Sequence, residues 1–88
     1  MAISVLVIDD QSSILQSMEV YFQLRAWDVH TAHNGRKGIA LAKKLQPALI
    51  VLDVRLPDIN GLDVLRKLKS LVPETEVYSH KTARIGAM

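Results

Sequence analysis

The sequence has no cysteine and few aromatic residues: one Trp, one Phe and two Tyr among 88 residues. Without cysteine the chain has no disulfide framework, no thiol redox chemistry and no cysteine-ligated zinc site. No apolar run approaches the roughly 18 residues that a membrane-spanning helix needs. No cationic segment precedes the first apolar stretch, as one would in a signal peptide. We therefore expect a cytoplasmic protein with no membrane partner.

The chain also lacks a strong charge of either sign, because 11 Lys and Arg residues face 9 Asp and Glu residues, for a net charge of +2. The clearest groupings of basic residues are separate pairs at positions 36–37, 43–44 and 66–67. Nucleic-acid binding needs basic residues clustered on one surface, and single strands need aromatic platforms among them. The pairs are better explained as solvated helix faces, so we expect no direct nucleic-acid partner.

The chain does contain a regular alternation of apolar patterns. Two short, nearly continuous apolar runs predict strands that are buried on both faces, and a more polar run between them predicts a strand nearer the sheet edge. Apolar residues at helical spacing after each run predict amphipathic helices. The expected strands cover residues 3–8, 27–31 and 48–52, and the expected helices cover residues 12–25, 38–45 and 62–72.

This alternation, in a chain long enough for one domain, predicts the α/β class: a doubly wound parallel sheet with helices on both faces and right-handed crossovers. The pattern weakens toward the C-terminus. Residues 76–78 predict the start of a fourth strand, residues 79–81 interrupt it, and residues 80–88 are only weakly helical. We expect one domain over residues 1–78, incomplete at its C-terminal end, and an atypical tail over residues 79–88.

Acidic residues follow two of the expected strands directly. Asp9 and Asp10 end the first strand, and Asp53 ends the third. Ligands of open parallel sheets bind beyond the carboxyl ends of the strands, where the strand order reverses. If these two strands are neighbours, three carboxylates crowd together, which is costly unless a cation neutralises them. An all-oxygen site suits Mg²⁺. Taken singly, each acid is equally explained as a helix cap or a solvated strand end.

Two motifs carry a resemblance to a known family. V-L-V-I-D-D at residues 5–10 and L-I-V-L-D-V-R-L-P-D-I-N-G at residues 49–61 resemble the receiver domain of two-component response regulators. The second motif is the more specific, because its acid is followed by Leu-Pro and Gly at the family's spacing. The resemblance covers residues 4–76. It implies a flavodoxin-like fold with strand order 2-1-3-4-5, in which the first and third strands are neighbours.

The resemblance also implies a role for each acid. Asp53 would be the phosphoryl acceptor, which attacks a phosphohistidine on a sensor histidine kinase or a small phosphodonor. Asp10 would ligate Mg²⁺ directly, and Asp9 would hold the ion through water. The backbone carbonyl of Arg55 would be a further metal ligand.

The resemblance is weaker at other positions. Pro57 and Gly61 would shape the loop after the acceptor, although they are equally compatible with an ordinary turn. In the family the fourth strand ends in Thr or Ser, and a Lys-Pro pair follows the fifth strand. Ser79 could replace the hydroxyl, but it comes early, and Thr82 is a poorer candidate. Lys81 does not follow a fifth strand, and the chain has no Lys-Pro pair.

Three explanations of this departure stay open: a fragment of a longer regulator, a sheet completed by a second copy, or a degenerate receiver. We expect a homo-oligomer that covers the open sheet edge. The predicted function is a phosphoacceptor domain rather than a turnover enzyme, with a non-phosphorylated dimerisation or interaction module as the alternative. A Mg²⁺-dependent phosphohydrolase is disfavoured, because the Asp-x-Asp nucleophile motif common in such enzymes is absent.

Overall fold

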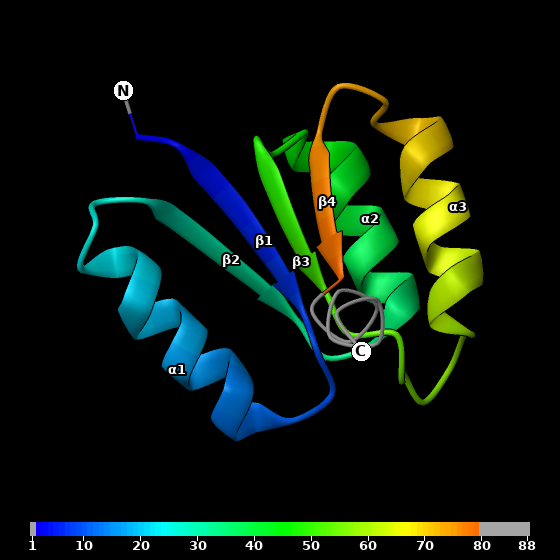
Figure 1. The fold of residues 1–88 in the computed structure, drawn as a ribbon, viewed down its shortest axis with the longest axis horizontal. Helices are drawn as coiled ribbons and strands as arrows, with labels where there is room; N and C mark the ends of the chain where they lie inside the picture. Colours follow the sequence, from blue (N-terminus) through cyan, green and yellow to red (C-terminus); the bar gives the residue numbers. More distant parts are fainter. Residues whose placement is uncertain (1, 80–88) are drawn as a thin grey trace, which may run out of the picture.

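The computed structural model describes residues 2–79 of the chain as alternating strands and helices (Figure 1). Expectations for residues 80–88, which include Lys81 and Thr82, lie outside these described residues. The elements are β1 (Ser4–Ile8), α1 (Ser12–Gln23), β2 (Asp28–Ala32), α2 (Gly35–Leu45), β3 (Leu49–Leu52), α3 (Gly61–Leu71) and β4 (Glu76–Ser79).

The four strands form one parallel sheet in the order β2-β1-β3-β4. This order confirms the predicted α/β class and the predicted pairing of the first and third strands. It also agrees with the first four positions of the expected order 2-1-3-4-5, and the expected fifth strand has no counterpart within residues 2–79. β4 includes Ser79, so this strand is one residue longer than the sequence pattern suggested.

Side-chain caps explain where two of the helices begin. α2 starts at Gly35, three residues before its first predicted apolar position, because the side chain of Asn34 accepts a hydrogen bond from the Lys37 N–H at 2.8 Å. Asn60 caps α3 in the same way and accepts from the Leu62 N–H at 2.8 Å. Asparagine is among the best residues for this position, because its oxygen satisfies an N–H that has no partner within the helix.

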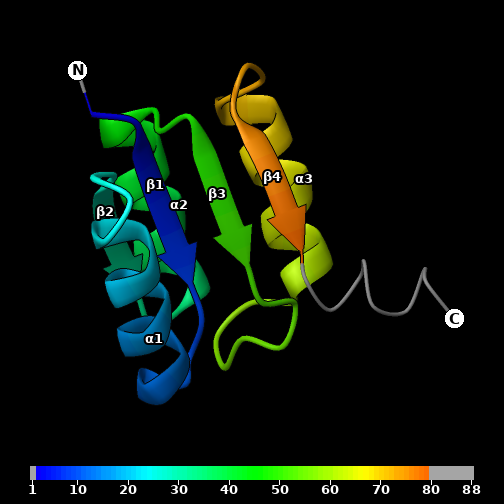
Figure 2. The ribbon, with the colours of Figure 1, turned by 60° about the vertical axis from the view of Figure 1, so that its left-hand side comes forward.

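The sheet separates two apolar clusters, as strands buried on both faces require. α2 and α3 cover one face, and α1 lies against the other, over β1 and β2 (Figures 1 and 2). The cluster under α2 and α3 includes fully buried residues of β1 and β3, and the smaller cluster under α1 includes Phe22, which lies beside the Trp27 ring at a centroid distance of 5.1 Å. Helices therefore cover β1 and β2 on both faces of the sheet.

None of the helices within residues 2–79 is long and apolar enough to cross a membrane.

Candidate functional site

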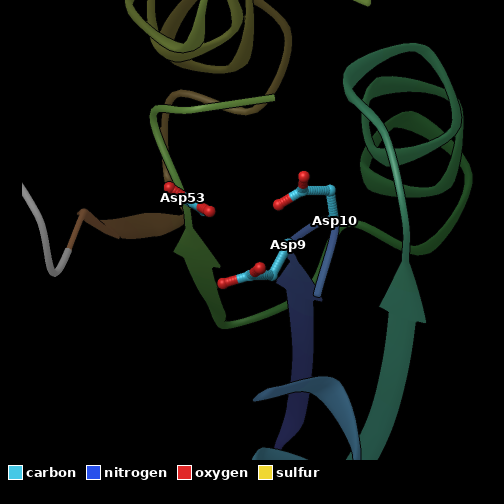
Figure 3. Close-up of side chains that lie close together, drawn as sticks. All are labelled: Asp9, Asp10 and Asp53. Carbon is cyan, nitrogen blue, oxygen red and sulfur yellow. The ribbon is translucent and has the colours of Figure 1, made fainter. Parts of the chain in front are cut away.

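Three acids lie beyond the carboxyl ends of β1 and β3 (Figure 3). The two strands are parallel neighbours in which Ile8 pairs with Leu52, so the next residues, Asp9 and Asp53, leave the sheet side by side. The backbone holds both positions, because the Asp53 N–H donates to the Ile8 carbonyl at 2.8 Å and the Asp9 N–H donates to a carbonyl of β2 at 3.0 Å. Asp10 follows Asp9 on the same edge, and these three residues are called the acidic cluster below.

The acidic cluster is compact and partly enclosed. One carboxylate oxygen from each of its three residues lies within 4.8 Å of the others. Asp9 and Asp53 are almost fully buried, at 3% and 2% exposed, whereas Asp10 is exposed. The predicted meeting of these acids is confirmed in the structure. No other group of three or more His, Asp or Glu residues within residues 2–79 comes this close together.

The electrostatics of the cluster are unfavourable for ionised acids. Burial raises the pKa of Asp9, and the neighbouring carboxylates of Asp53 and Asp10 raise it further, against a lowering by the Gln11 N–H. That N–H donates to Asp9 Oδ1 at 2.9 Å. Like charges this close resist joint ionisation unless a cation lies between them.

The donor set fits a hard cation. Carboxylate oxygens are the ligands that Mg²⁺ prefers, and it usually keeps waters alongside one or two protein carboxylates. The acids also present their oxygens in fixed orientations, since Asp53 Oδ1 accepts from the Arg55 N–H at 2.9 Å. Which of these atoms bind a metal stays a prediction, and so does the role of the Arg55 carbonyl.

The loop after β3 (residues 53–60, the β3–α3 loop) turns sharply back on itself. Gly61 is buried where this loop enters α3, and its N–H donates to the Val54 carbonyl at 3.1 Å. A Cβ atom at this position would overlap the Val54 backbone, so only glycine fits without a shift. Pro57 is exposed within the loop, where its fixed φ suits a turn. Both positions agree with the predicted loop-shaping roles, which the structure does not test as functions.

Ser79 lies at the same edge of the sheet as the acidic cluster. It is the last residue of β4, and the register pairs it with Leu52, the residue before Asp53. Ser79 is buried, at 8% exposed. A residue that seemed early along the chain therefore occupies the strand end next to the central acid, because the four-residue β4 lies in register with β3. Its use as a phosphoryl-contacting hydroxyl stays a prediction.

One residue of this region escaped the sequence analysis. Asp58, in the β3–α3 loop, accepts hydrogen bonds from the first two N–H groups of α2, those of Gly35 and Arg36. Sequence patterns identify helix caps from residues next to the helix, and Asp58 is more than twenty residues away. An acid beside a proline in a loop indicates only a turn.

An apolar groove lies on the other side of the sheet from α2 and α3. Its volume is about 640 Å³, and it runs between α1 and the strands β3 and β4. Within residues 2–79 no helix covers these two strands on this face (Figure 2). Tyr21 and Tyr78 on its walls are half exposed, at 49% and 51%. The groove is lined by Ile14, Ser17, Met18, Tyr21, Phe22, Leu49, Val51 and Tyr78.

Comparison with known proteins gives a consistent family. The family model described as "Response regulator receiver domain" matches residues 5–83, nearly the whole chain. Among curated proteins, the probable transcriptional regulatory protein TcrX of Mycobacterium tuberculosis is 41% identical over 71 residues, which are 81% of this chain and 30% of that protein. The cell cycle response regulator CtrA of Brucella ovis is 42% identical over 65 residues, 74% of this chain and 28% of that protein. The chain thus spans under a third of these relatives' length.

Solved structures agree with this result. The chemotaxis protein CheY4 of Vibrio cholerae superimposes with a TM-score of 0.82 at 26% identity, over 99% of this chain and 79% of that one. The signal receiver domain of a putative LuxO repressor from Vibrio parahaemolyticus gives a TM-score of 0.80 at 30% identity, over 88% and 59% of the two chains. A receiver domain from Methanospirillum hungatei, at 22% identity and a TM-score of 0.86, supports the fold alone.

Proposed function

The chain belongs to the response regulator receiver family, and from this premise we propose that Asp53 is a phosphoacceptor, phosphorylated by a sensor histidine kinase in a Mg²⁺-dependent reaction. The observation that carries the proposal is the acidic cluster. Its three carboxylates meet within 4.8 Å at the edge of a parallel sheet, and Asp53 belongs to the motif at residues 49–61 that resembles the family. A single strand-end acid would be explained by solvation or capping, but three acids in one cluster, two of them buried, need another explanation.

The metal ligands proposed are the carboxylates of Asp9, Asp10 and Asp53, with the backbone carbonyl of Arg55 as a further oxygen. A bound Mg²⁺ would neutralise charge on the transferring phosphoryl group and on the acids. Direct ligation by Asp10 and contact through water by Asp9 are the roles that the family resemblance implies.

The reaction is an in-line phosphoryl transfer. A carboxylate oxygen of Asp53 attacks the phosphorus atom of a phosphohistidine, the phosphorus–nitrogen bond breaks, and the imidazole leaves and takes up a proton. The product is an aspartyl phosphate on this chain. Burial of Asp53 supports this use, because an enclosed acyl phosphate is protected from water. Ser79, at the neighbouring strand end, is proposed to contact the phosphoryl oxygens through its hydroxyl.

In this function the chain is a cytoplasmic signalling partner of the kinase and not an enzyme that turns over free substrate. Pro57 and Gly61 serve it by shaping the β3–α3 loop, which joins the acceptor to α3.

The test is incubation with Mg²⁺ and acetyl phosphate, followed by intact-mass measurement. We expect a single phosphoryl adduct that disappears in Asp53→Asn and when the metal is chelated. Asp63→Asn is the matched control and should keep the adduct, since Asp63 is an exposed acid of α3 that bonds Arg66. Metal binding without an adduct would refute the phosphoacceptor function, and multiple turnover of a phosphoester would indicate a phosphohydrolase.

A second candidate function is a homo-oligomeric interaction module. Two observations favour it: β4 pairs only with β3 within residues 2–79, and the apolar groove beside it is uncovered there. An open strand edge next to exposed apolar surface favours pairing with another chain. A second copy of this chain brings an equivalent edge and groove, as a closed twofold dimer requires. This function and phosphorylation do not exclude each other.

A further inference from the structure

Asp58 joins the β3–α3 loop to the start of α2. Its Oδ1 accepts a hydrogen bond from the Gly35 N–H at 2.7 Å, and its Oδ2 accepts from the Arg36 N–H at 3.0 Å. Both carboxylate oxygens are therefore engaged by consecutive backbone N–H groups of one helix. Hydrogen bonds to an ionised group are stronger than those between neutral groups.

These bonds complete the N-terminus of α2. Asn34 satisfies the Lys37 N–H from within the chain's own turn, which leaves the two preceding N–H groups to Asp58. A helix N-terminus carries partial positive charge, so an anion is favoured there. The effect is visible on the acid: the pKa of Asp58 is lowered, chiefly by the hydrogen bond from Arg36 and also by the one from Gly35.

The packing around this contact is close. Gly35 is buried, and a Cβ atom added to it would lie 3.0 Å from Val64 Cγ2 and 3.3 Å from Asp58 Oδ1. The first turn of α2 thus lies directly against the loop and against α3. Because Gly35 has no Cβ atom, the Asp58 carboxylate can approach the N–H groups at the start of the helix.

The same loop holds the proposed acceptor. The Arg55 N–H donates to Asp53 Oδ1 at 2.9 Å, and at the far end of the loop the Gly61 N–H donates to the Val54 carbonyl at 3.1 Å. Asp58 lies between these two attachments, three residues after Arg55. If Asp58 moved away from α2, the middle of the loop would no longer be attached to that helix. Because only two residues separate Asp58 from Arg55, the Arg55 backbone would move with it.

We propose that Asp58 is a positioning residue, which holds the β3–α3 loop on α2 and thereby fixes the orientation of the Asp53 carboxylate and the Arg55 backbone. Its importance for phosphoryl transfer rests on the function proposed above, but the structural link itself does not.

Hydrogen exchange tests the link without any phosphorylation. In Asp58→Ala we expect exchange at the Arg55 and Gly61 amides to rise about tenfold, the ratio corresponding to loss of a charge-assisted hydrogen bond. The Leu6 amide in the centre of the sheet reports global opening, so the comparison uses the ratio of Arg55 to Leu6 exchange. Asp63→Asn, an exposed acid outside this contact, should leave the ratio unchanged.

A second variant keeps the test decisive if Asp58→Ala does not fold. Asp58→Asn retains one acceptor oxygen and should raise the ratio by less than the alanine variant does. If either folded variant accelerates only the Gly35 and Arg36 amides, Asp58 is a local helix cap and the proposal is wrong.

The rate of phosphorylation by acetyl phosphate supplies a separate readout in variants that stay folded. We expect Asp58→Ala to react about tenfold more slowly, with Asp58→Asn intermediate and Asp63→Asn like the wild type. Equal rates in all four proteins would overturn the positioning role. A wild-type chain that takes up no phosphoryl group would instead refute the proposed function, and the exchange ratio would still decide the role of Asp58.

Discussion

At the scale of single residues, Asp9 shows that burying an acid among other acids is unfavourable for its ionised form. It is 3% exposed, its pKa is raised by burial and by the neighbouring acids, and only the Gln11 N–H offsets this. A buried acid with a raised pKa binds its proton more tightly in the folded state than in the unfolded state. Its contribution to stability is therefore most favourable below the ordinary pKa of 3.8 and is lost as the pH rises through the raised value in the fold.

The prediction is that Asp9→Asn raises the melting temperature of the metal-free protein at neutral pH, because the amide removes a buried charge and its repulsion. The gain should vanish at a pH below about 3.8, where the wild-type acid is protonated in both states. Thermal unfolding with chelator across this range measures both effects. Mg²⁺ should stabilise the wild type more than the variant.

Glu74→Gln provides the control for this measurement. Glu74 is an exposed acid that precedes β4, at the opposite end of the sheet from the acidic cluster. A stabilisation of equal size in this variant would mean that net charge, and not the buried site, sets the effect.

At the scale of elements, a close backbone approach decides how the β3–α3 loop enters α3. Gly61 allows the start of α3 to pass against the Val54 backbone, and Asn60 caps the helix from the adjoining position. The loop therefore needs a residue without a Cβ atom at one point, for reasons of close approach rather than of a left-handed φ.

We predict that Gly61→Ala destabilises the fold by about 1–3 kcal/mol, the usual cost of inserting an extra group into packed structure. Chemical denaturation with urea measures this change. The comparison variant is Gly35→Ala, whose added Cβ would meet only side-chain atoms, at 3.0 Å or more, and should cost less. Equal costs at the two positions would contradict the backbone-contact explanation of Gly61.

At the scale of the whole molecule, the two faces of the sheet are unequal within residues 2–79. α2 and α3 together cover one face, while α1 covers only part of the other (Figure 2). The uncovered part contains the apolar groove beside β3 and β4. Tyr78 belongs to both exposed features, because it lies on the edge strand β4 and also lines the groove.

The prediction at this scale concerns self-association. Tyr78→Lys should raise the dissociation constant of the proposed homo-oligomer at least about tenfold, because a lysine on an edge strand opposes pairing. Sedimentation equilibrium measures the change. Val20→Lys makes the same substitution at an exposed apolar site of α1 outside the groove and should have little effect. A wild-type chain that is folded and monomeric at micromolar concentration would contradict the oligomer.

The sequence by itself determined the succession of strands and helices and the acids that end two strands. These features depend on local sequence patterns: buried strands such as β1 (Ser4–Ile8) give nearly continuous apolar runs, and cap residues adjoin their helices. The predicted boundaries differed by a few residues where a side chain such as Asn34 extends a helix beyond its apolar positions.

The meeting of the three acids was predicted from the sequence, but only the tertiary structure decided three other contacts between distant residues. Asp58 accepts a hydrogen bond from Gly35, Ser79 pairs with Leu52, the residue before Asp53, and an apolar groove lies between α1 and β4. Each contact joins segments whose separation along the chain carries no periodic signal, because the register between parallel strands and the packing of helices on a sheet are set by the folded core. The acids that end the strands were readable from the sequence, whereas the contacts of Asp58 and Ser79 followed from the fold.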